Sequence, residues 1–245
     1  MTASAVLFSG GLDSAVLLAM ELRDRTEVWP VHIRTGLAWE DAEARAIDRQ
    51  LACPPLTEAA RPDGSGGRRL QRLSTLHVEM RDVYPPAHWA VEGRAPAFDT
   101  PDEDVYLEGR NVILLSKAAV FCSRHGLNCI AIGPLAGNPF PDATPAFFTA
   151  MAHALSLGLA RPLSIVTPLA TMHKDDVVRQ GLELGVPLDL TLSCMNPQPA
   201  SAAEDGSGRA GDLHCGQCSK CRERRDAFRD AGVDDPTAYA VTPVR

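Results

Sequence analysis

Six residues near the N-terminus have the types and spacing of an anion-binding loop: Ser9, Gly10, Gly11, Leu12, Asp13 and Ser14. An apolar segment of β-type composition precedes them, and a segment of helix-forming composition follows. The first N–H groups of such a helix are unpaired, and the helix dipole adds to their attraction for an anion. The glycines let a phosphate approach the backbone, and the serines add hydroxyl donors. We predict a phosphate site; an ordinary Ser/Gly turn before a helix is the alternative.

A cysteine cluster near the C-terminus is the second group of side chains that could do chemistry. Cys215, Cys218 and Cys221 follow one another at intervals of three, and Cys194 lies upstream as a fourth thiol. Four thiolates suit tetrahedral Zn²⁺, and a closed shell of four cysteines makes the zinc structural rather than catalytic. An iron–sulfur cluster and reduced thiols without metal are the alternatives. We favour zinc, because nothing else in the sequence indicates redox chemistry.

Three polar residues stand at the starts of predicted helices. Arg110 can form a forked contact with phosphate or carboxylate, and Asn111 can bond a base edge; a simple helix-capping turn is the alternative. Lys174 begins a later helix, where the dipole disfavours a cation. A negative ligand close to Lys174 would explain its position, and a phosphate of ATP is the obvious candidate.

A Pro/Gly-dense segment after another predicted strand should line the same crevice. Asn138, Phe140 and Asp142 are its candidate ligand-binding residues. Such a segment is rigid and still permits close approach of a ligand. Asp142 could bind a ligand amine or Mg²⁺, or it could cap the helix that begins near Pro145.

Composition limits the class of protein. The 245 residues are 45% hydrophobic and 22% charged, as in a globular domain with a full core. A net charge of −7 argues against a generic nucleic-acid-binding protein. No apolar run approaches the roughly 20 residues that cross a bilayer, and the N-terminus has no secretory pattern. We therefore expect a cytoplasmic protein whose cysteines are thiols or metal ligands.

Short apolar segments alternate with helical ones, which predicts an α/β fold: a parallel sheet flanked by helices. The predicted strands are residues 4–9, 27–33, 129–133 and 163–167, with a short one near 76–78. The predicted helices are 13–23, 40–51, 111–125, 145–157, 174–184 and 220–231. Residues 54–104 read as a long insertion, either a lid or partly disordered, and residues 196–212 as a flexible excursion. Ligands bind beyond the carboxyl ends of such strands, where the loop at residues 9–14 falls.

In order along the chain, these motifs resemble the ExsB/QueC family of 7-cyano-7-deazaguanine synthases. The likeness joins SGGLDS, the EGRN segment ending at Asn111, NPFPD ending at Asp142, TPL before Lys174, and Ser-Cys followed by the spaced cysteines. It implies a PP-loop, adenine nucleotide alpha-hydrolase-like fold. Residues 1–190 would form the ATP-binding domain, and residues 191–245 a small helical region that binds one structural zinc. A homodimer is also expected from the resemblance.

The resemblance further implies ATP-dependent conversion of 7-carboxy-7-deazaguanine and ammonia to the nitrile, through an acyl-adenylate and an amide. Asp13, Ser14 and Lys174 would be catalytic; the loop residues with Arg110 and Asn111 would bind ATP and Mg²⁺; Asn138, Phe140 and Asp142 would bind the acceptor. The stretch from His32 to Glu40 departs from the family pattern. A paralogue that adenylates another carboxylate, including one on a macromolecule, and a non-catalytic zinc protein that binds nucleotide are therefore alternatives.

Overall fold

The computed structural model describes residues 3–59, 69–199 and 211–241. Its centre is a six-stranded sheet in the order β3-β2-β1-β5-β6, with β4 also paired to β2. Every strand pair is parallel. The strands are β1 (Ala3–Leu7), β2 (Glu27–Arg34), β3 (Arg69–Leu70), β4 (Ser74–His77), β5 (Cys129–Ala131) and β6 (Ser164–Val166).

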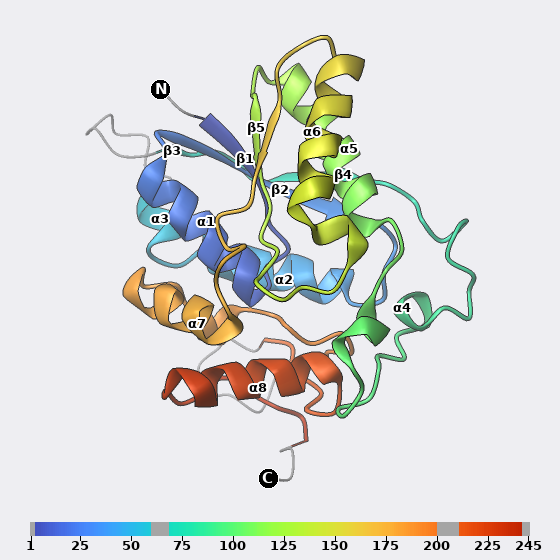
Figure 1. Cartoon of the computed structure of the whole chain (residues 1–245). Coiled ribbons are helices and arrows are strands. Elements are labelled where there is room, and N and C mark those ends of the chain that lie inside the picture. The colour runs from blue at the N-terminus through green and yellow to red at the C-terminus, as the bar shows by residue number, and fades with distance from the viewer. Residues whose placement is uncertain (1–2, 60–68, 200–210, 242–245) are drawn as a thin grey trace.

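Helices cover both faces of this sheet (Figure 1). The longer ones are α1 (Leu12–Asp24), α2 (Glu40–Leu51), α5 (Arg110–Arg124), α6 (Pro145–Gly158), α7 (Lys174–Glu183) and α8 (Ser219–Ala231). Short turns of helix are α3 (Leu56–Ala59), α4 (Trp89–Glu92), η1 (Asp102–Val105), η2 (Pro141–Ala143) and η3 (Leu188–Leu190). The predicted α/β class, a parallel sheet flanked by helices, is confirmed.

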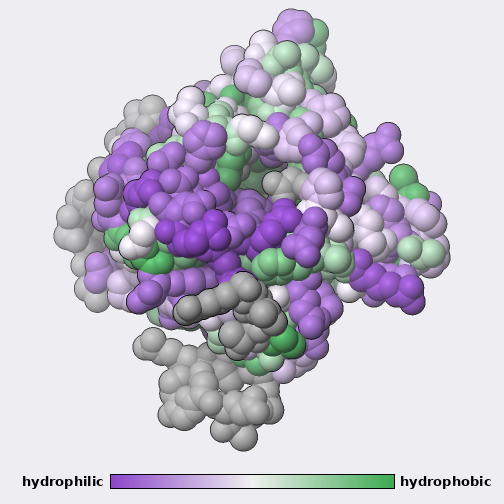
Figure 2. Space-filling view, turned by 60° about the horizontal axis from the view of Figure 1, so that its bottom comes forward, coloured by the Kyte–Doolittle hydropathy of each residue, from purple (hydrophilic) through white to green (hydrophobic). Residues whose placement is uncertain are grey.

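Two apolar clusters hold the layers together. One joins the sheet to α1, α2 and α7 and includes Phe8, Val16 and Val177; the other joins it to α5 and α6 and includes Leu115 and Phe148. In the central strand β1, Ser4, Ala5 and Val6 are completely buried, as expected for a strand covered on both faces. The face seen in Figure 2 is mostly hydrophilic. Among the helices of the described residues, none has both the length and the apolar character of a membrane span.

The six predicted helices are all present, and their ends differ from the prediction by one residue at most. Three predicted strands (4–9, 129–133 and 163–167) are longer than the observed ones; just beyond two of the named strands lie Phe8 and Ile132. Their N–H groups still donate to the next strand, to Val31 O at 2.9 Å and to Val166 O at 3.1 Å. The sequence did not reveal α3, α4 or β3, which have only two to four residues each.

The two irregular segments contain more structure than their composition indicates. Within the insertion at 54–104, Met80, Tyr84 and Ala90 pack with Trp39 in a separate apolar cluster; residues 60–68 of this insertion lie outside the described residues. In the excursion at 196–212, residues 200–210 are likewise outside them. Its ends are joined by paired backbone hydrogen bonds between Gln198 and Leu213 of 2.9 and 2.8 Å. The two ends of the excursion therefore lie side by side, close in sequence to Cys194 and Cys215.

Candidate active site and metal centre

The predicted anion loop connects β1 to α1 at the carboxyl end of the sheet. Gly10 has φ +75°, and a Cβ there would lie 3.0 Å from the Ile47 side chain, so the turn requires glycine. Ser14 Oγ donates to Gly11 O at 3.0 Å and accepts from the Ser9 backbone N–H at 3.2 Å. No side chain of the described residues caps α1 at its N-cap, Gly11. The first N–H groups of α1 are therefore available to an anion.

Lys174 joins the loop to the C-terminal helix through a chain of opposite charges. Its Nζ lies 2.7 Å from Asp13 Oδ2 and 3.1 Å from Glu223 Oε1, and Glu223 Oε2 pairs with Lys220 Nζ at 2.5 Å. Burial alone would lower the pKa of Lys174, but Asp13 and Glu223 outweigh it and raise that pKa. The charge that balances Lys174 thus comes from two protein carboxylates, where the sequence indicated a bound phosphate.

Asp13 also has a free coordination position. Its Oδ1 is buried and has no hydrogen-bond partner among the described residues, whereas its Oδ2 is held by Lys174. Carboxylate oxygens are the protein ligands that Mg²⁺ prefers. The site therefore fits a magnesium ion carried in with a phosphate ligand.

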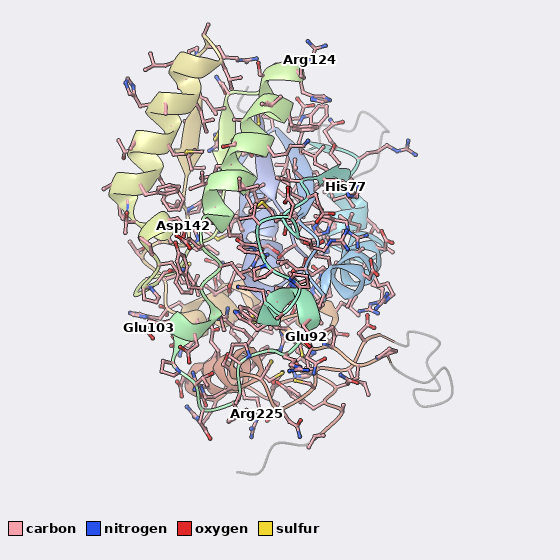
Figure 3. All side chains as sticks on the ribbon, turned by 90° about the vertical axis from the view of Figure 1, so that its right-hand side faces the viewer. His77, Glu92, Glu103, Arg124, Asp142 and Arg225 are labelled. Atoms are coloured by element: carbon pink, nitrogen blue, oxygen red, sulfur yellow. The ribbon has the colours of Figure 1, made fainter. Side chains whose placement is uncertain are left out.

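Asp142 connects the starts of two helices. Its Oδ2 accepts the backbone N–H of Asn111 at 2.9 Å, and its backbone O accepts from Asn111 Nδ2 at 2.9 Å. Figure 3 shows Asp142 between the ends of α5 and α6. The alternative in which Asp142 caps the helix near Pro145 is wrong, because Thr144 Oγ1 caps α6 by accepting from Phe147 N–H. Asp142 caps α5 instead, which leaves its Oδ1 for a ligand.

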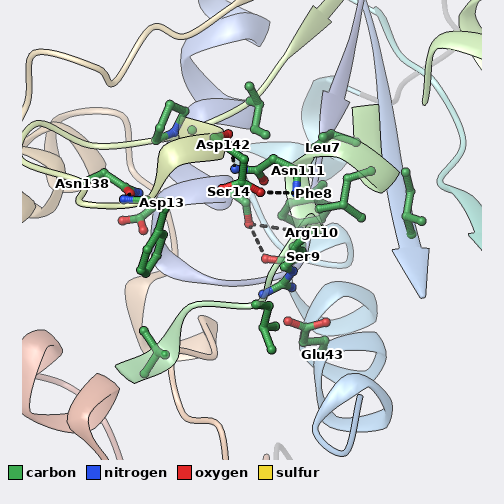
Figure 4. Close-up of a pocket in the computed structure, with 18 of the residues that line it drawn as sticks. Leu7, Phe8, Ser9, Asp13, Ser14, Glu43, Arg110, Asn111, Asn138 and Asp142 are labelled. Atoms are coloured by element: carbon green, nitrogen blue, oxygen red, sulfur yellow. Dashed lines mark hydrogen bonds between the residues drawn. The ribbon is translucent and has the colours of Figure 1, made fainter. Parts of the chain in front are cut away.

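A pocket of about 290 Å³ brings these segments together (Figure 4). Among the predicted residues it is lined by Ser9, Asp13, Ser14, Arg110, Asn111, Asn138, Phe140 and Asp142. Its walls also include apolar side chains from three strand ends, Leu7, Val31 and Ile132, and from α5. The pocket thus combines apolar walls, which suit the base of a nucleotide, with the loop at one end, which suits its phosphates. Gly11, Leu12 and Lys174 line a smaller adjoining pocket instead.

Sequence reasoning missed three side chains at this site. His32 on β2 is only 2% exposed, lines the pocket, and has an Nε2 with no hydrogen-bond partner among the described residues. Glu43 on α2 and Lys220 on α8 line both pockets. Glu40 and Glu43 stand at positions i and i+3 in the first turn of a helix, a signal that normally indicates only a favourable dipole interaction. The sequence did not reveal that both glutamate side chains are buried.

Glu43 is buried at a cost in stability. Burial raises its pKa from 4.5 to about 7, although Arg110 partly opposes the rise. The folded protein therefore keeps a proton that the unfolded chain releases near pH 4.5. The stability contributed by the protonated carboxyl is complete below that pH and is lost as the pH rises to about 7.

We expect Glu43→Gln to raise the free energy of unfolding at pH 8 by about 1–3 kcal/mol, since each pKa unit is worth roughly 1.4 kcal/mol. Glutamine has the same shape and carries no charge that must be desolvated. Urea unfolding at pH 8 and pH 4.5 measures the effect, and the gain should largely disappear at the lower pH. An equal gain at both pH values would contradict the charge explanation.

The four predicted metal ligands meet in one buried cluster. The sulfur atoms of Cys194, Cys215, Cys218 and Cys221 all lie within 4.8 Å of one another. Three of these Sγ···Sγ distances are 3.4–3.9 Å, near the roughly 3.8 Å that tetrahedral Zn–S bonds of about 2.3 Å require. Backbone N–H groups of Asn196 and Cys215 point at the Cys194 sulfur, at 3.3 and 3.2 Å. The cluster therefore fits a tetrahedral metal bound by thiolates.

Neighbouring residues support the cluster without entering it. His214 is not a member; its Nε2 accepts the Ser193 N–H at 3.0 Å. Arg224 on α8 is fully buried and donates to Thr191 Oγ1 at 2.8 Å and Leu188 O at 2.8 Å. These contacts tie the segment that carries Cys194 to the helix that carries Cys221. Since α8 also carries Lys220, the cluster positions a residue of the pocket.

Comparison with known proteins identifies the family of the chain. The family model described as "Queuosine biosynthesis protein QueC" matches residues 70–232. A 7-cyano-7-deazaguanine synthase of Methanothrix thermoacetophila is 31% identical over 248 residues, which cover 98% of this chain and 99% of that protein. Another, from Anaeromyxobacter dehalogenans, is 32% identical over 97% of this chain and 95% of that protein. With a family model over most of its length and such full-length relatives, the chain belongs to the QueC family.

Proposed function

We propose that this chain converts 7-carboxy-7-deazaguanine and ammonia to 7-cyano-7-deazaguanine, with two molecules of ATP cleaved to AMP and pyrophosphate. The carboxylate is first activated as an acyl-adenylate, which ammonia converts to an amide. The second ATP activates the amide, and loss of AMP leaves the nitrile. The observation that carries the proposal is the gathering of the Ser9–Ser14 loop, Arg110 and Asp142 around one pocket in a chain whose full-length relatives bear this enzyme's name.

In this proposal, residues 1–190 form the ATP-binding domain and residues 191–245 the metal-binding region. The loop N–H groups and the Ser9 and Ser14 hydroxyls bind the phosphates, and Lys174 balances charge beside Asp13. Magnesium held through Asp13 would supply positive charge to the phosphate oxygens. Arg110 approaches the α-phosphate or the carboxylate, because it lines both pockets.

The acceptor is proposed to contact Asn138, Phe140 and Asp142. Phe140 stacks on Tyr106 with ring centroids 5.2 Å apart, which gives the pocket a flat aromatic wall. The amino-pyrimidinone edge of the acceptor is rich in donors, and Asp142 Oδ1 is an acceptor that the cap of α5 does not use. A planar, donor-bearing heterocycle therefore suits this end of the pocket.

Supplying the purified protein with ATP, Mg²⁺, ammonia and 7-carboxy-7-deazaguanine tests the proposal. We expect release of pyrophosphate and AMP and a nitrile product detected by mass. Activation of ATP without nitrile would contradict the proposed acceptor. The altered stretch from His32 to Glu40 would then direct the search to a different carboxylate.

Two variants of Asp142 distinguish its role as the cap of α5 from its proposed role in binding the acceptor. Asp142→Asn keeps an oxygen for the Asn111 N–H but loses the charge, so its melting temperature should stay near that of the wild type. Loss of one buried hydrogen-bond partner is worth about 1–3 kcal/mol, so use of the acid should fall roughly 5- to 150-fold. Asp142→Ala should in addition lose stability, by about 1 kcal/mol for the cap. Steady-state kinetics with saturating ATP measures the first effect, and unchanged kinetics in Asp142→Asn would contradict the contact.

A further inference from the structure

Glu43 stands where the two pockets meet. It lies on α2, is 8% exposed, and lines both the larger pocket and the smaller one of about 160 Å³ beside it. Four other residues are common to both cavities: Ser9, Arg110, Met195 and Lys220. Figure 4 shows Glu43 on the same side of the site as Ser9 and Arg110. The carboxyl is thus beside the phosphate loop and at the junction of the two pockets.

The neighbouring carboxylate on α2 shows what a purely structural role looks like here. Glu40 is 2% exposed, and its oxygens accept from Thr35 N–H at 2.6 Å, Thr35 Oγ1 at 2.9 Å and Gly36 N–H at 3.0 Å. Those bonds fasten the turn after β2. Glu43 has no such set of backbone donors among the described residues; a hydrogen bond from the Trp39 side chain stabilises its charged form. Its carboxyl is consequently available to the pockets.

We propose that Glu43 is the proton acceptor in the amide-forming step, a role that rests on the function proposed above. Ammonia attacks the acyl carbon of the adenylate, and a C–N bond forms. The C–O bond to AMP breaks, and its electron pair leaves on the phosphate oxygen. The nitrogen must then lose one proton, which passes to the Glu43 carboxylate and afterwards to solvent. Adenylation itself transfers no proton from the acid, so it does not need this base.

The electrostatic surroundings suit a base at neutral pH. Burial raises the pKa of Glu43 to about 7, and a general base works best when its pKa is near the working pH. Nearby cations favour its ionised form, whereas Glu40 opposes it. The charged groups that act on it are Arg110 from α5, Arg34 from β2 and Glu40 from α2. His32 from β2 and Lys220 from α8 line the same pocket.

The closing experiment follows the two half-reactions separately in Glu43→Gln, Glu43→Asp and the wild type. Acid-dependent ATP–pyrophosphate exchange reports adenylation, and mass detection of amide plus nitrile reports the step that needs the base. We expect Glu43→Gln to keep exchange within about two-fold and to lose about 10²-fold or more in product formation. Glu43→Asp should recover part of the loss. Glu21→Gln, at a buried glutamate of α1 outside both pockets, is the matched control and should leave both readouts unchanged.

The pH dependence of product formation is a second measurement, and it would not depend on Glu43 if this carboxyl had only a structural role. Total ammonium is adjusted at each pH so that free ammonia stays constant. Wild-type product formation should then rise through about pH 7, because the base works only when deprotonated, and Glu43→Gln should lack this rise.

Two results would overturn the role of Glu43. If exchange and product formation fell equally in Glu43→Gln, the carboxyl would position Arg110 or the loop instead. Wild-type product formation in that variant would also exclude it as the base. Failure of the wild type to make amide or nitrile while exchange continues is a distinct outcome, because it overturns the proposed acceptor reaction and with it this step.

Discussion

Replacing Asp13 by alanine is expected to lower ATP-to-AMP conversion by about 10²–10³-fold and to leave the fold intact. The carboxylate offers a buried Oδ1 that has no hydrogen-bond partner in the described part of the chain, and its other oxygen holds Lys174 at 2.7 Å. Removing it deletes the proposed magnesium contact and breaks the ion pair that holds Lys174 beside the loop. A preorganised group that stabilises transition-state charge is worth this much in other enzymes. AMP and pyrophosphate formation, measured with ATP and the deazapurine acid, gives the effect.

One control and one further variant of the loop make this prediction specific. Asp48→Ala removes an exposed carboxylate of α2 and should change neither turnover nor the melting temperature by more than about 2 °C. Ser14→Ala should reproduce most of the loss, because Ser14 Oγ organises the turn through Ser9 and Gly11. Wild-type turnover in both Asp13→Ala and Ser14→Ala would contradict the assignment of the loop.

The sequence predicts the layered fold well, because its signals are local. Each long helix has a start or a stop that can be read in its residues, such as Pro145 at the start of α6 or Gly232 after α8, where φ is +76°. Strand order and the β2–β4 pairing depend on contacts between distant segments, which no local pattern specifies. The insertion at 54–104 was underestimated for the same reason. Its helical turn α4 is stabilised by packing against Trp39 and Leu37, not by propensity.

The candidate site was predicted where residue type and spacing alone identify the chemistry. The loop and the four cysteines have this property, and the structure places each set together. Residue type and spacing do not identify the chemistry of Glu43, His32 and Lys220, because ordinary surface helices and strands also carry such residues. Only their position in the wall of the pocket beside the loop distinguishes them.

The arginine run at residues 222–225 is a further feature whose structure differs from what its sequence pattern indicates. Such a run suggests a solvated helix face. In the structure, Arg224 is fully buried, and Arg222 Nη1 donates to Phe98 O at 2.8 Å and Thr100 O at 2.9 Å. Backbone oxygens of a remote segment supply these partners, and sequence spacing cannot reveal them.

Replacing Cys218 by serine is expected to remove the metal and to lower the melting temperature by about 10 °C or more. We propose that the cluster binds one structural Zn²⁺ per chain, because four buried thiols close the coordination shell without an open position. Binding of such a metal contributes directly to folding, and a loss of about 4 kcal/mol corresponds to roughly 10 °C in a chain of this size. Elemental analysis and thermal unfolding of the variant and the wild type measure both effects.

The matched control is Cys53→Ser, a half-buried thiol outside the cluster, which should retain the metal and most of the stability. Because α8 carries Lys220 and Glu223 from the cluster to the pocket, activity of Cys218→Ser should decline in parallel with the folded fraction. A stable Cys218→Ser that keeps zinc would exclude this thiol as a ligand. A brown wild-type protein that contains iron and bleaches in air would show that the four thiols hold an iron–sulfur cluster instead.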